Sequence, residues 1–158
     1  MKIPFKPIGI EDKDIITSFT IPSNYKNCDY SFANICSWRF LYDSEFAIVD
    51  GSLLIRFWIE NKTRVAYMTP TGQGNLKQAI DLLEADSLEQ GHPLCMLGVT
   101  PDAKEELERL YGVNVLPVQA DVSKDGDNEK VVRNVVDRAV ETFGGIDVLI
   151  NNAQASAS

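Results

Sequence analysis

A short loop near the middle of the sequence has the residue types that bind phosphate groups. Gly72 and Gly74 flank Gln73 after an apolar, strand-like run, and Asn75 stands where a helical pattern begins. Glycines let a loop aim backbone N–H groups at an anion, and the N-terminus of the following helix favours negative charge. These four residues are therefore the candidate phosphate-binding residues. The alternative is a connecting turn that binds no ligand, which is the more frequent role of a turn of this type before a helix.

Other catalytic residue types are sparse. His92 is the only histidine and lies in a Gly-His-Pro turn, so neither a Ser-His-Asp arrangement nor a histidine metal cluster is available. Glu105, Glu106 and Glu108 lie among basic residues on one predicted helix, which is typical of a solvated face rather than of paired catalytic carboxylates. We therefore name no catalytic residue and no metal ligand.

The first half of the chain predicts two helices followed by an antiparallel sheet. Residues 11–19 and 32–42 have helical apolar spacing, and the second segment has so few polar positions that we expect it to be buried on most sides. Two strand-like runs meet at Asp50-Gly51, the dipeptide that suits a type I′ hairpin. A turn at Asn61 leads to a third strand, which completes a meander.

The second half alternates strands and helices, which is the pattern of parallel pairing with crossover connections. Residues 93–99, 113–119 and 146–150 read as strands, and helices are expected between them. The fold class is therefore α/β, with an antiparallel meander continued by parallel strands and helices on both faces. The clearest helical stripe consists of Val132, Val135, Val136, Ala139, Val140 and Phe143.

The overall composition is that of an ordinary globular protein, with 44% hydrophobic and 24% charged residues in 158. The net charge of −8 opposes binding to nucleic acid or anionic lipid. No apolar run approaches the roughly 20 residues of a membrane span, and no signal segment is recognisable, so a cytoplasmic location is expected. The sequence has three cysteines, Cys28, Cys36 and Cys95, without CxxC spacing. An odd number without this spacing favours buried or unreactive thiols over a disulfide framework or a zinc site.

The types of apolar residue used along the chain change near Gly112. Of the 14 aromatic residues only Phe143 lies beyond it, whereas 10 of the 13 valines do. The change alone carries little weight, but the two halves also resemble different families.

The segments FKPIGIEDKDII, CDYSFANICSWR and EFAIVDGSLLIRF make residues 1–111 similar to the phosphatidylglycerol lysyltransferase C-terminal-like family. The resemblance implies the first of two tandem lobes of the acetyltransferase (GNAT) type, with transfer chemistry expected in a missing second lobe. It also implies a loop, residues 69–75, that would wrap the pyrophosphate of coenzyme A. Both glycines of the family's loop match, but Thr69 replaces its leading Gln or Arg.

Residues 112–158 resemble the middle of a short-chain dehydrogenase/reductase. The resemblance implies contacts to NAD or NADP from Asp121 with Val122, and from the NNAG-like motif Asn151, Asn152 and Ala153. The family's glycine-rich turn does not precede these residues, and its Tyr-x-x-x-Lys pair does not follow them. The pyrophosphate therefore has no cradle, and no group is placed to move a proton during hydride transfer.

Our first hypothesis is a composite or recombined domain with no complete active site, in which residues 112–158 complete the sheet of residues 1–111. The alternatives are a GNAT-like acyl- or aminoacyl-transferase lobe that binds coenzyme A through residues 69–75, and an NAD(P)-binding fragment of a dehydrogenase. No cofactor is expected under the first hypothesis. An open edge at residues 146–150 would favour a homodimer.

Overall fold

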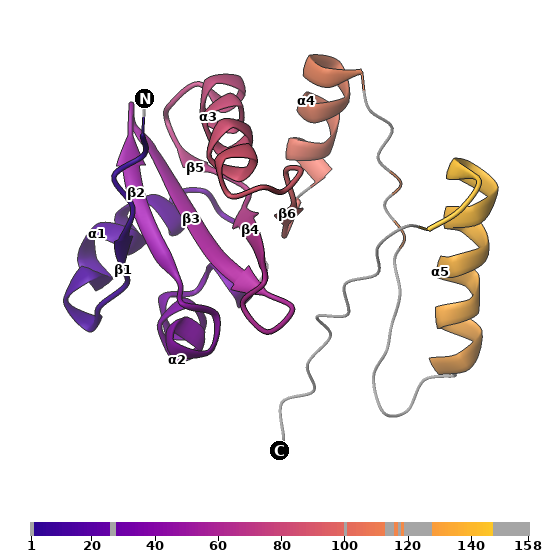
Figure 1. The fold of residues 1–158 in the computed structure, drawn as a ribbon, viewed down its shortest axis with the longest axis horizontal. Helices are drawn as coiled ribbons and strands as arrows, with labels where there is room; N and C mark the ends of the chain where they lie inside the picture. Colours follow the sequence, from indigo (N-terminus) through magenta and orange to yellow (C-terminus); the bar gives the residue numbers. More distant parts are fainter. Residues whose placement is uncertain are drawn as a thin grey trace. The chain divides into compact units, whose positions relative to one another are not determined.

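The structure, a computed structural model, describes residues 2–25, 28–99, 101–112, 116, 118 and 128–146. The chain divides into two compact units, Met1–Tyr111 and Gly112–Ser158. We call them unit 1 and unit 2 and describe each separately (Figure 1).

The antiparallel meander predicted for unit 1 is confirmed. Strands β2 (Glu45–Val49), β3 (Ser52–Ile59) and β4 (Arg64–Met68) pair in sequence order. Between β2 and β3, Asp50 and Gly51 have φ angles of 47° and 77°. Positive φ at both central residues defines the type I′ turn, so the hairpin predicted from Asp50-Gly51 is confirmed.

Two short strands extend the meander into a mixed sheet of order β1-β2-β3-β4-β6. Strand β1 (Lys6–Pro7) pairs antiparallel with β2, and β6 (Met96–Leu97) pairs parallel with β4. The proline in β1 has no N–H to offer, which protects that edge from a further strand. The predicted α/β class, with antiparallel strands continued by a parallel one, is confirmed.

The chain leaves β4 through a β-bulge. Strand β5 (Thr71–Gly72) continues along β3, but the register shifts: Arg56 lies opposite Tyr67, whereas Leu53 lies opposite Thr71. The three-residue step along β3 matches a four-residue step along β4 and β5, so one extra residue has been inserted. The bulge lies at the start of the predicted phosphate-binding loop.

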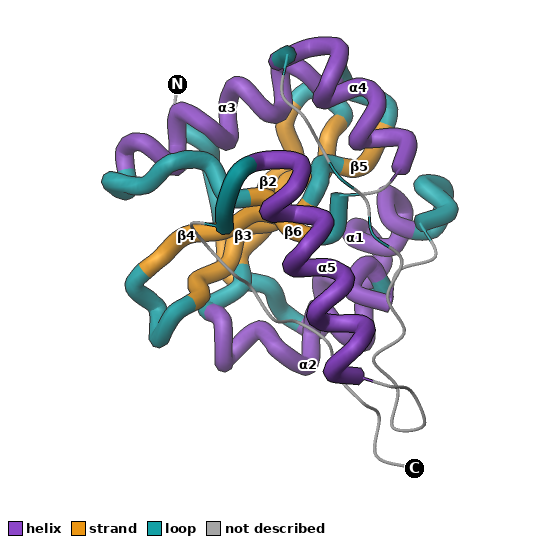
Figure 2. The backbone as a smooth tube through the Cα atoms, turned by 90° about the vertical axis from the view of Figure 1, so that its right-hand side faces the viewer, coloured by secondary structure: helices purple, strands orange, loops and turns teal. Residues whose placement is uncertain are grey.

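Helices cover both faces of the sheet (Figures 1 and 2). One core joins the sheet to α1 and α2 through Ile16, Ile35 and Leu53; the other joins it to α3 through Leu54 and Leu83. In unit 1 the helices are η1 (Ile10–Asp12), α1 (Lys13–Thr20), η2 (Cys28–Tyr30), α2 (Phe32–Tyr42), α3 (Leu76–Glu89) and α4 (Pro101–Tyr111).

The expectation that α2 is buried on most sides is wrong. Ile35 and Cys36 are buried, but Phe40 is 75% exposed and Leu41 is 55% exposed. The helix has only one side against the sheet, and its apolar residues extend around to the solvent side. Composition alone says that a helix is apolar, but not how many neighbours it has.

In unit 2 the structure describes one helix, α5 (Asn128–Phe143), as predicted from its apolar spacing. Val132, Val140 and Phe143 on the predicted stripe are 44–53% exposed. The predicted strands 113–119 and 146–150 lie outside the described residues, except for Leu116, Val118 and Ile146, which belong to no strand. A shared sheet and dimerisation through residues 146–150 therefore stay predictions.

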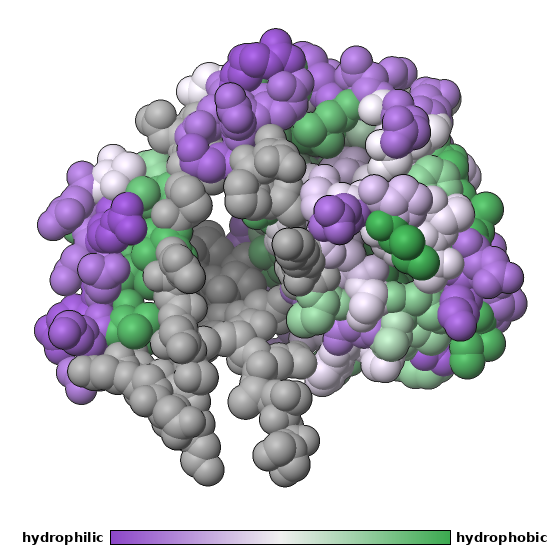
Figure 3. All heavy atoms as spheres, turned by 180° about the vertical axis from the view of Figure 1, so that it is seen from behind, coloured by the Kyte–Doolittle hydropathy of each residue, from purple (hydrophilic) through white to green (hydrophobic). Residues whose placement is uncertain are grey.

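The described surface mixes polar and apolar side chains, as the face drawn in Figure 3 shows. No helix of the described residues combines the length and the apolar character that crossing a membrane requires.

Both core clusters of unit 1 are built, in their described members, from residues 3–94. A chain truncated after Gly112 is therefore expected to keep a cooperative thermal transition, with far-ultraviolet circular dichroism typical of a mixed α/β fold. Loss of that transition on truncation would show that residues beyond Gly112 are needed for the interior of unit 1.

Candidate functional site

The predicted phosphate-binding loop is fastened to the hairpin between β2 and β3. The N–H groups of Gln73 and Gly74 both donate to the carbonyl oxygen of Gly51, at N···O distances of 3.1 and 3.2 Å. These are the donors that a phosphate cradle would turn toward its ligand. In this structure they instead hold the loop against the neighbouring turn.

The two glycines of the loop are required by this packing. A Cβ atom at Gly72 would collide with the Gly51 carbonyl, and one at Gly74 would collide with the Ser52 hydroxyl and the Asp50 carbonyl. Gly72 also has a φ angle of 130°, which side chains rarely adopt. Close approach of two backbone segments thus accounts for both glycines without a ligand.

The side chains around the loop do not form a phosphate site either. Asn75 caps α3, accepting from the Gln78 N–H at 2.9 Å. Lys77, in the first turn of α3, donates to Asp81 at 2.7 Å. The buried Thr71 hydroxyl has no partner among the described residues, but Thr71 pairs with Leu53 and so lies on the α1 side of the sheet, opposite α3.

A second polar cluster, which the sequence did not reveal, lies on the α3 side of the sheet. Glu45, Arg56 and Tyr67 stand side by side on β2, β3 and β4, and Asp86 of α3 lies against them. Arg56 donates to Glu45 at 3.0 Å and to both oxygens of Asp86 at 2.9 and 3.0 Å. The Tyr67 hydroxyl donates to Asp86 at 2.6 Å, and the Phe5 ring covers the guanidinium at 4.2 Å.

This cluster is buried and internally paired. The side chains of Arg56 and Asp86 are 14% and 5% exposed, and Tyr67 is fully buried. Burial alone would lower the pKa of Arg56, but its bonds to Glu45 and Asp86 outweigh this and raise the pKa. Burial, assisted by the bond to Asp86, raises the pKa of Tyr67. The four groups therefore act as a structural lock between α3 and the sheet.

Tyr30 is a third buried polar group, on the opposite face. Its hydroxyl lies 3.3 Å from the Thr69 carbonyl oxygen and 3.2 Å from that of Gly98. Burial raises the pKa of Tyr30 to about 12, so the phenol is neutral at physiological pH.

The remaining predicted residues have structural surroundings or lie outside the described part. The His92 N–H donates to Ser87 and closes the end of α3. Glu106 and Glu108 form ion pairs along α4 with Arg109 and Lys104, as expected of a solvated face. The candidate nucleotide contacts Asp121, Val122, Asn151, Asn152 and Ala153 lie outside the described residues.

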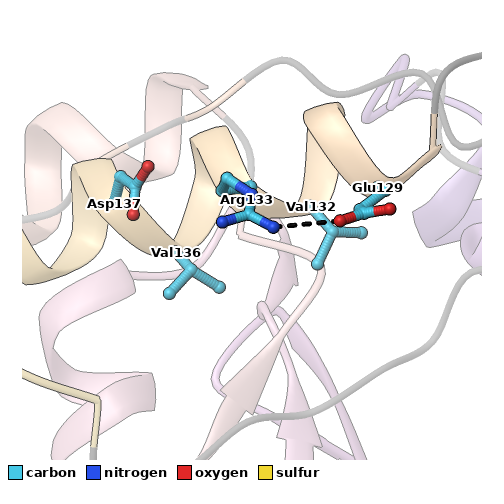
Figure 4. A pocket seen from close by; sticks show the side chains of 5 residues that line it. All are labelled: Glu129, Val132, Arg133, Val136 and Asp137. Carbon is cyan, nitrogen blue, oxygen red and sulfur yellow. Dashed lines mark hydrogen bonds and ion pairs between the residues drawn. The ribbon is translucent and has the colours of Figure 1, made fainter.

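The described residues offer no group of three His, Cys, Asp or Glu side chains placed to hold a metal ion. A hollow beside α5 has all its described lining on that one helix (Figure 4). In it Arg133 is paired with Glu129 at 2.9 Å. Residues from a single helix do not provide converging polar groups, so this hollow defines no site.

Comparison with known proteins shows the family of the chain. The model of the family described as "Phosphatidylglycerol lysyltransferase, C-terminal" matches residues 22–131. The chain belongs to this family. A conserved protein of unknown function from Bacteroides thetaiotaomicron VPI-5482 has a similar structure, with a TM-score of 0.68 and 36% identity. That likeness covers 90% of this chain and 51% of the other, so the chain spans about half the length of the Bacteroides protein.

The second predicted resemblance is also confirmed. The chain is 60% identical to a 12alpha-hydroxysteroid dehydrogenase from Clostridium sp. (strain ATCC 29733 / VPI C48-50) over 57 residues, 36% of this chain and 22% of that enzyme. It is 38% identical to an uncharacterized oxidoreductase from Thermotoga maritima over 93 residues, 57% of this chain and 33% of the other. The chain thus covers a third or less of these relatives.

The two resemblances overlap. The 57 residues matched to the dehydrogenase exceed the 47 residues of Gly112–Ser158, so that likeness includes at least ten residues before Gly112. The lysyltransferase family match in turn extends to residue 131, beyond the boundary at Tyr111. The two partial likenesses therefore overlap along the chain.

Replacing Arg56 by alanine leaves two carboxylates without their cation inside unit 1. We expect the free energy of unfolding, from urea titration, to fall by about 3–5 kcal/mol. Lys62→Ala, which breaks the exposed pair with Asp43, is the matched control and should cost less than about 1 kcal/mol. Equal effects of the two substitutions would refute the structural lock.

Stability should fall in alkaline solution because Tyr30 keeps its proton when folded. Its folded pKa of about 12 exceeds its ordinary value of 10.0, so its contribution is complete below pH 10 and is lost as pH rises through 12. Between these values we expect a slope of about 1.4 kcal/mol per pH unit from Tyr30, with Tyr67 acting in the same direction. Urea titrations should show a shallower slope for Tyr30→Phe; identical slopes would contradict the assignment.

Proposed function

We propose that unit 1 is a non-catalytic lobe of the lysyltransferase C-terminal type, in a composite α/β chain without a complete active site. The observation that supports this is the engagement of the Gln73 and Gly74 N–H groups by the Gly51 carbonyl. A coenzyme A pyrophosphate at this loop would need those donors, and Thr69 stands where the GNAT pattern has a Gln or Arg. The loop instead serves as a packing element.

The paired side chains of unit 1 support the same proposal. General acid–base catalysis needs a titratable group that can reach a substrate, with a pKa near the working pH. Glu45, Arg56, Tyr67 and Asp86 satisfy one another, and the Tyr30 phenol donates to backbone carbonyls. These groups hold elements together, and their bonds would have to break before they could handle a proton in a reaction.

The rival function is an acyl- or aminoacyl-transferase lobe that binds coenzyme A through residues 69–75. It would require the peptide groups at Gln73 and Gly74 to rotate away from Gly51. A partner lobe would also have to supply the rest of the site.

A melting series with coenzyme A separates these two functions. A ligand specific to the folded state raises stability by RT ln(1 + [L]/Kd), so binding would appear as a concentration-dependent rise in Tm. We expect no rise at millimolar coenzyme A, and background rates for acyl and aminoacyl transfer. A rise in Tm that Gly74→Ala abolishes, while the variant stays folded, would support the rival. Turnover in either transfer assay would contradict the non-catalytic proposal.

A second candidate is nucleotide binding by unit 2, favoured by the 60% identity to a dehydrogenase. Asp121 and Val122 would contact the adenine, and Asn151, Asn152 and Ala153 would line the cofactor site. A titration with NAD, monitored by calorimetry, tests it. Asp121→Ala is the variant, and Asp125→Ala is a nearby acidic control. Binding weakened at least tenfold by Asp121→Ala alone supports this candidate, whereas no heat at millimolar NAD excludes it.

A further inference from the structure

The parallel pairing of β4 with β6, the last strand in the order of the described sheet, is short. It has two register pairs, Tyr67 with Met96 and Met68 with Leu97, whereas β2 and β3 share five. The Tyr67 N–H also donates to the Cys95 carbonyl at 2.9 Å. So few backbone bonds give little resistance to local opening.

Just past this pair, the pairing of the two strands ends. The bulge carries the segment after β4 from Thr69 through Pro70 into β5, and Gly98, with a φ angle of 69°, follows β6. An extra residue in a strand disrupts the ladder, so the bulge frees backbone groups from strand pairing. Buried carbonyls of this kind need a donor from elsewhere.

Tyr30 supplies that donor. Its hydroxyl lies almost equally far from the Thr69 and Gly98 carbonyl oxygens, the first just after β4 and the second just after β6. The phenol has a single proton, which the two acceptors share. The Thr69 hydroxyl adds a longer contact of 3.5 Å to the same Gly98 oxygen.

The ring itself is firmly placed. Tyr30 is 3% exposed and belongs to the core cluster on the α1 and α2 side, and the Tyr25 ring lies 4.8 Å away between centroids. Tyr30 comes from η2, far in sequence from both strands. A hydroxyl held by a packed ring is pre-positioned and loses little freedom when it bonds.

We propose that Tyr30 is a latch that holds the ends of β4 and β6 together, so that its withdrawal opens the sheet locally at Thr69 and Gly98. The hydroxyl joins two strands that have few bonds of their own. The latch does not depend on the function proposed above, because it concerns opening of the fold and not a ligand.

Hydrogen exchange followed by mass spectrometry on the full chain tests the latch, with Tyr30→Phe as the variant. Phenylalanine keeps the ring and removes the donor. We expect amide exchange in residues 94–99 to rise about tenfold or more, because the Thr69 and Gly98 carbonyls lose their shared donor, while β2 and β3 stay unchanged.

Tyr25→Phe is the matched control, because no hydrogen bond among the described residues holds the Tyr25 hydroxyl; it should leave residues 94–99 as in the unmodified chain. Unchanged exchange in Tyr30→Phe, or an equal rise in both variants, would overturn the proposal. If Tyr30→Phe does not fold, NMR of the unmodified chain decides. A slowly exchanging phenolic proton on Tyr30 supports the latch, and a freely exchanging one overturns it.

Discussion

The carbonyl oxygen of Gly51 is the point on which the loop of unit 1 depends. It lies in the type I′ turn that joins β2 to β3, and it accepts from both Gln73 and Gly74. The turn therefore sets the hairpin and also fixes where the chain runs between β4 and α3. Because this contact places backbone against backbone, it leaves no room for side chains at Gly72 or Gly74. A glycine pattern typical of phosphate binding thus has a complete explanation in packing.

Polar side chains on both faces of the sheet are also hydrogen-bonded within the protein. On the α3 face, Arg56 joins Glu45 of β2 to Asp86 of α3, and Tyr67 completes the set. On the other face, Tyr30 reaches the ends of β4 and β6. Arg56 and Tyr30 each bond to partners from different elements, which fixes register and helix position together. Groups engaged in this way stabilise the lobe and are poorly placed for chemistry.

The predictable parts of the fold were those with local causes. Asp50-Gly51 specified its turn, because that signal acts within a few residues. The Arg56 cluster could not be predicted, since it joins positions 11 to 30 residues apart through strand register and helix docking. Exposure of Phe40 was missed for a related reason: the number of neighbours around a helix is a tertiary property. Two partial family likenesses were visible in sequence motifs, but their overlap across Gly112 was not.

The most direct measurement on this account is NMR of the Gln73 and Gly74 amide protons in the isotopically labelled chain, with and without coenzyme A. Bonds to the Gly51 carbonyl predict slow exchange and small temperature coefficients for both protons, with chemical shifts that coenzyme A leaves unchanged. Rapid exchange in the free chain, or shifts of both protons that titrate with coenzyme A, would contradict the claim that this loop is a packing element.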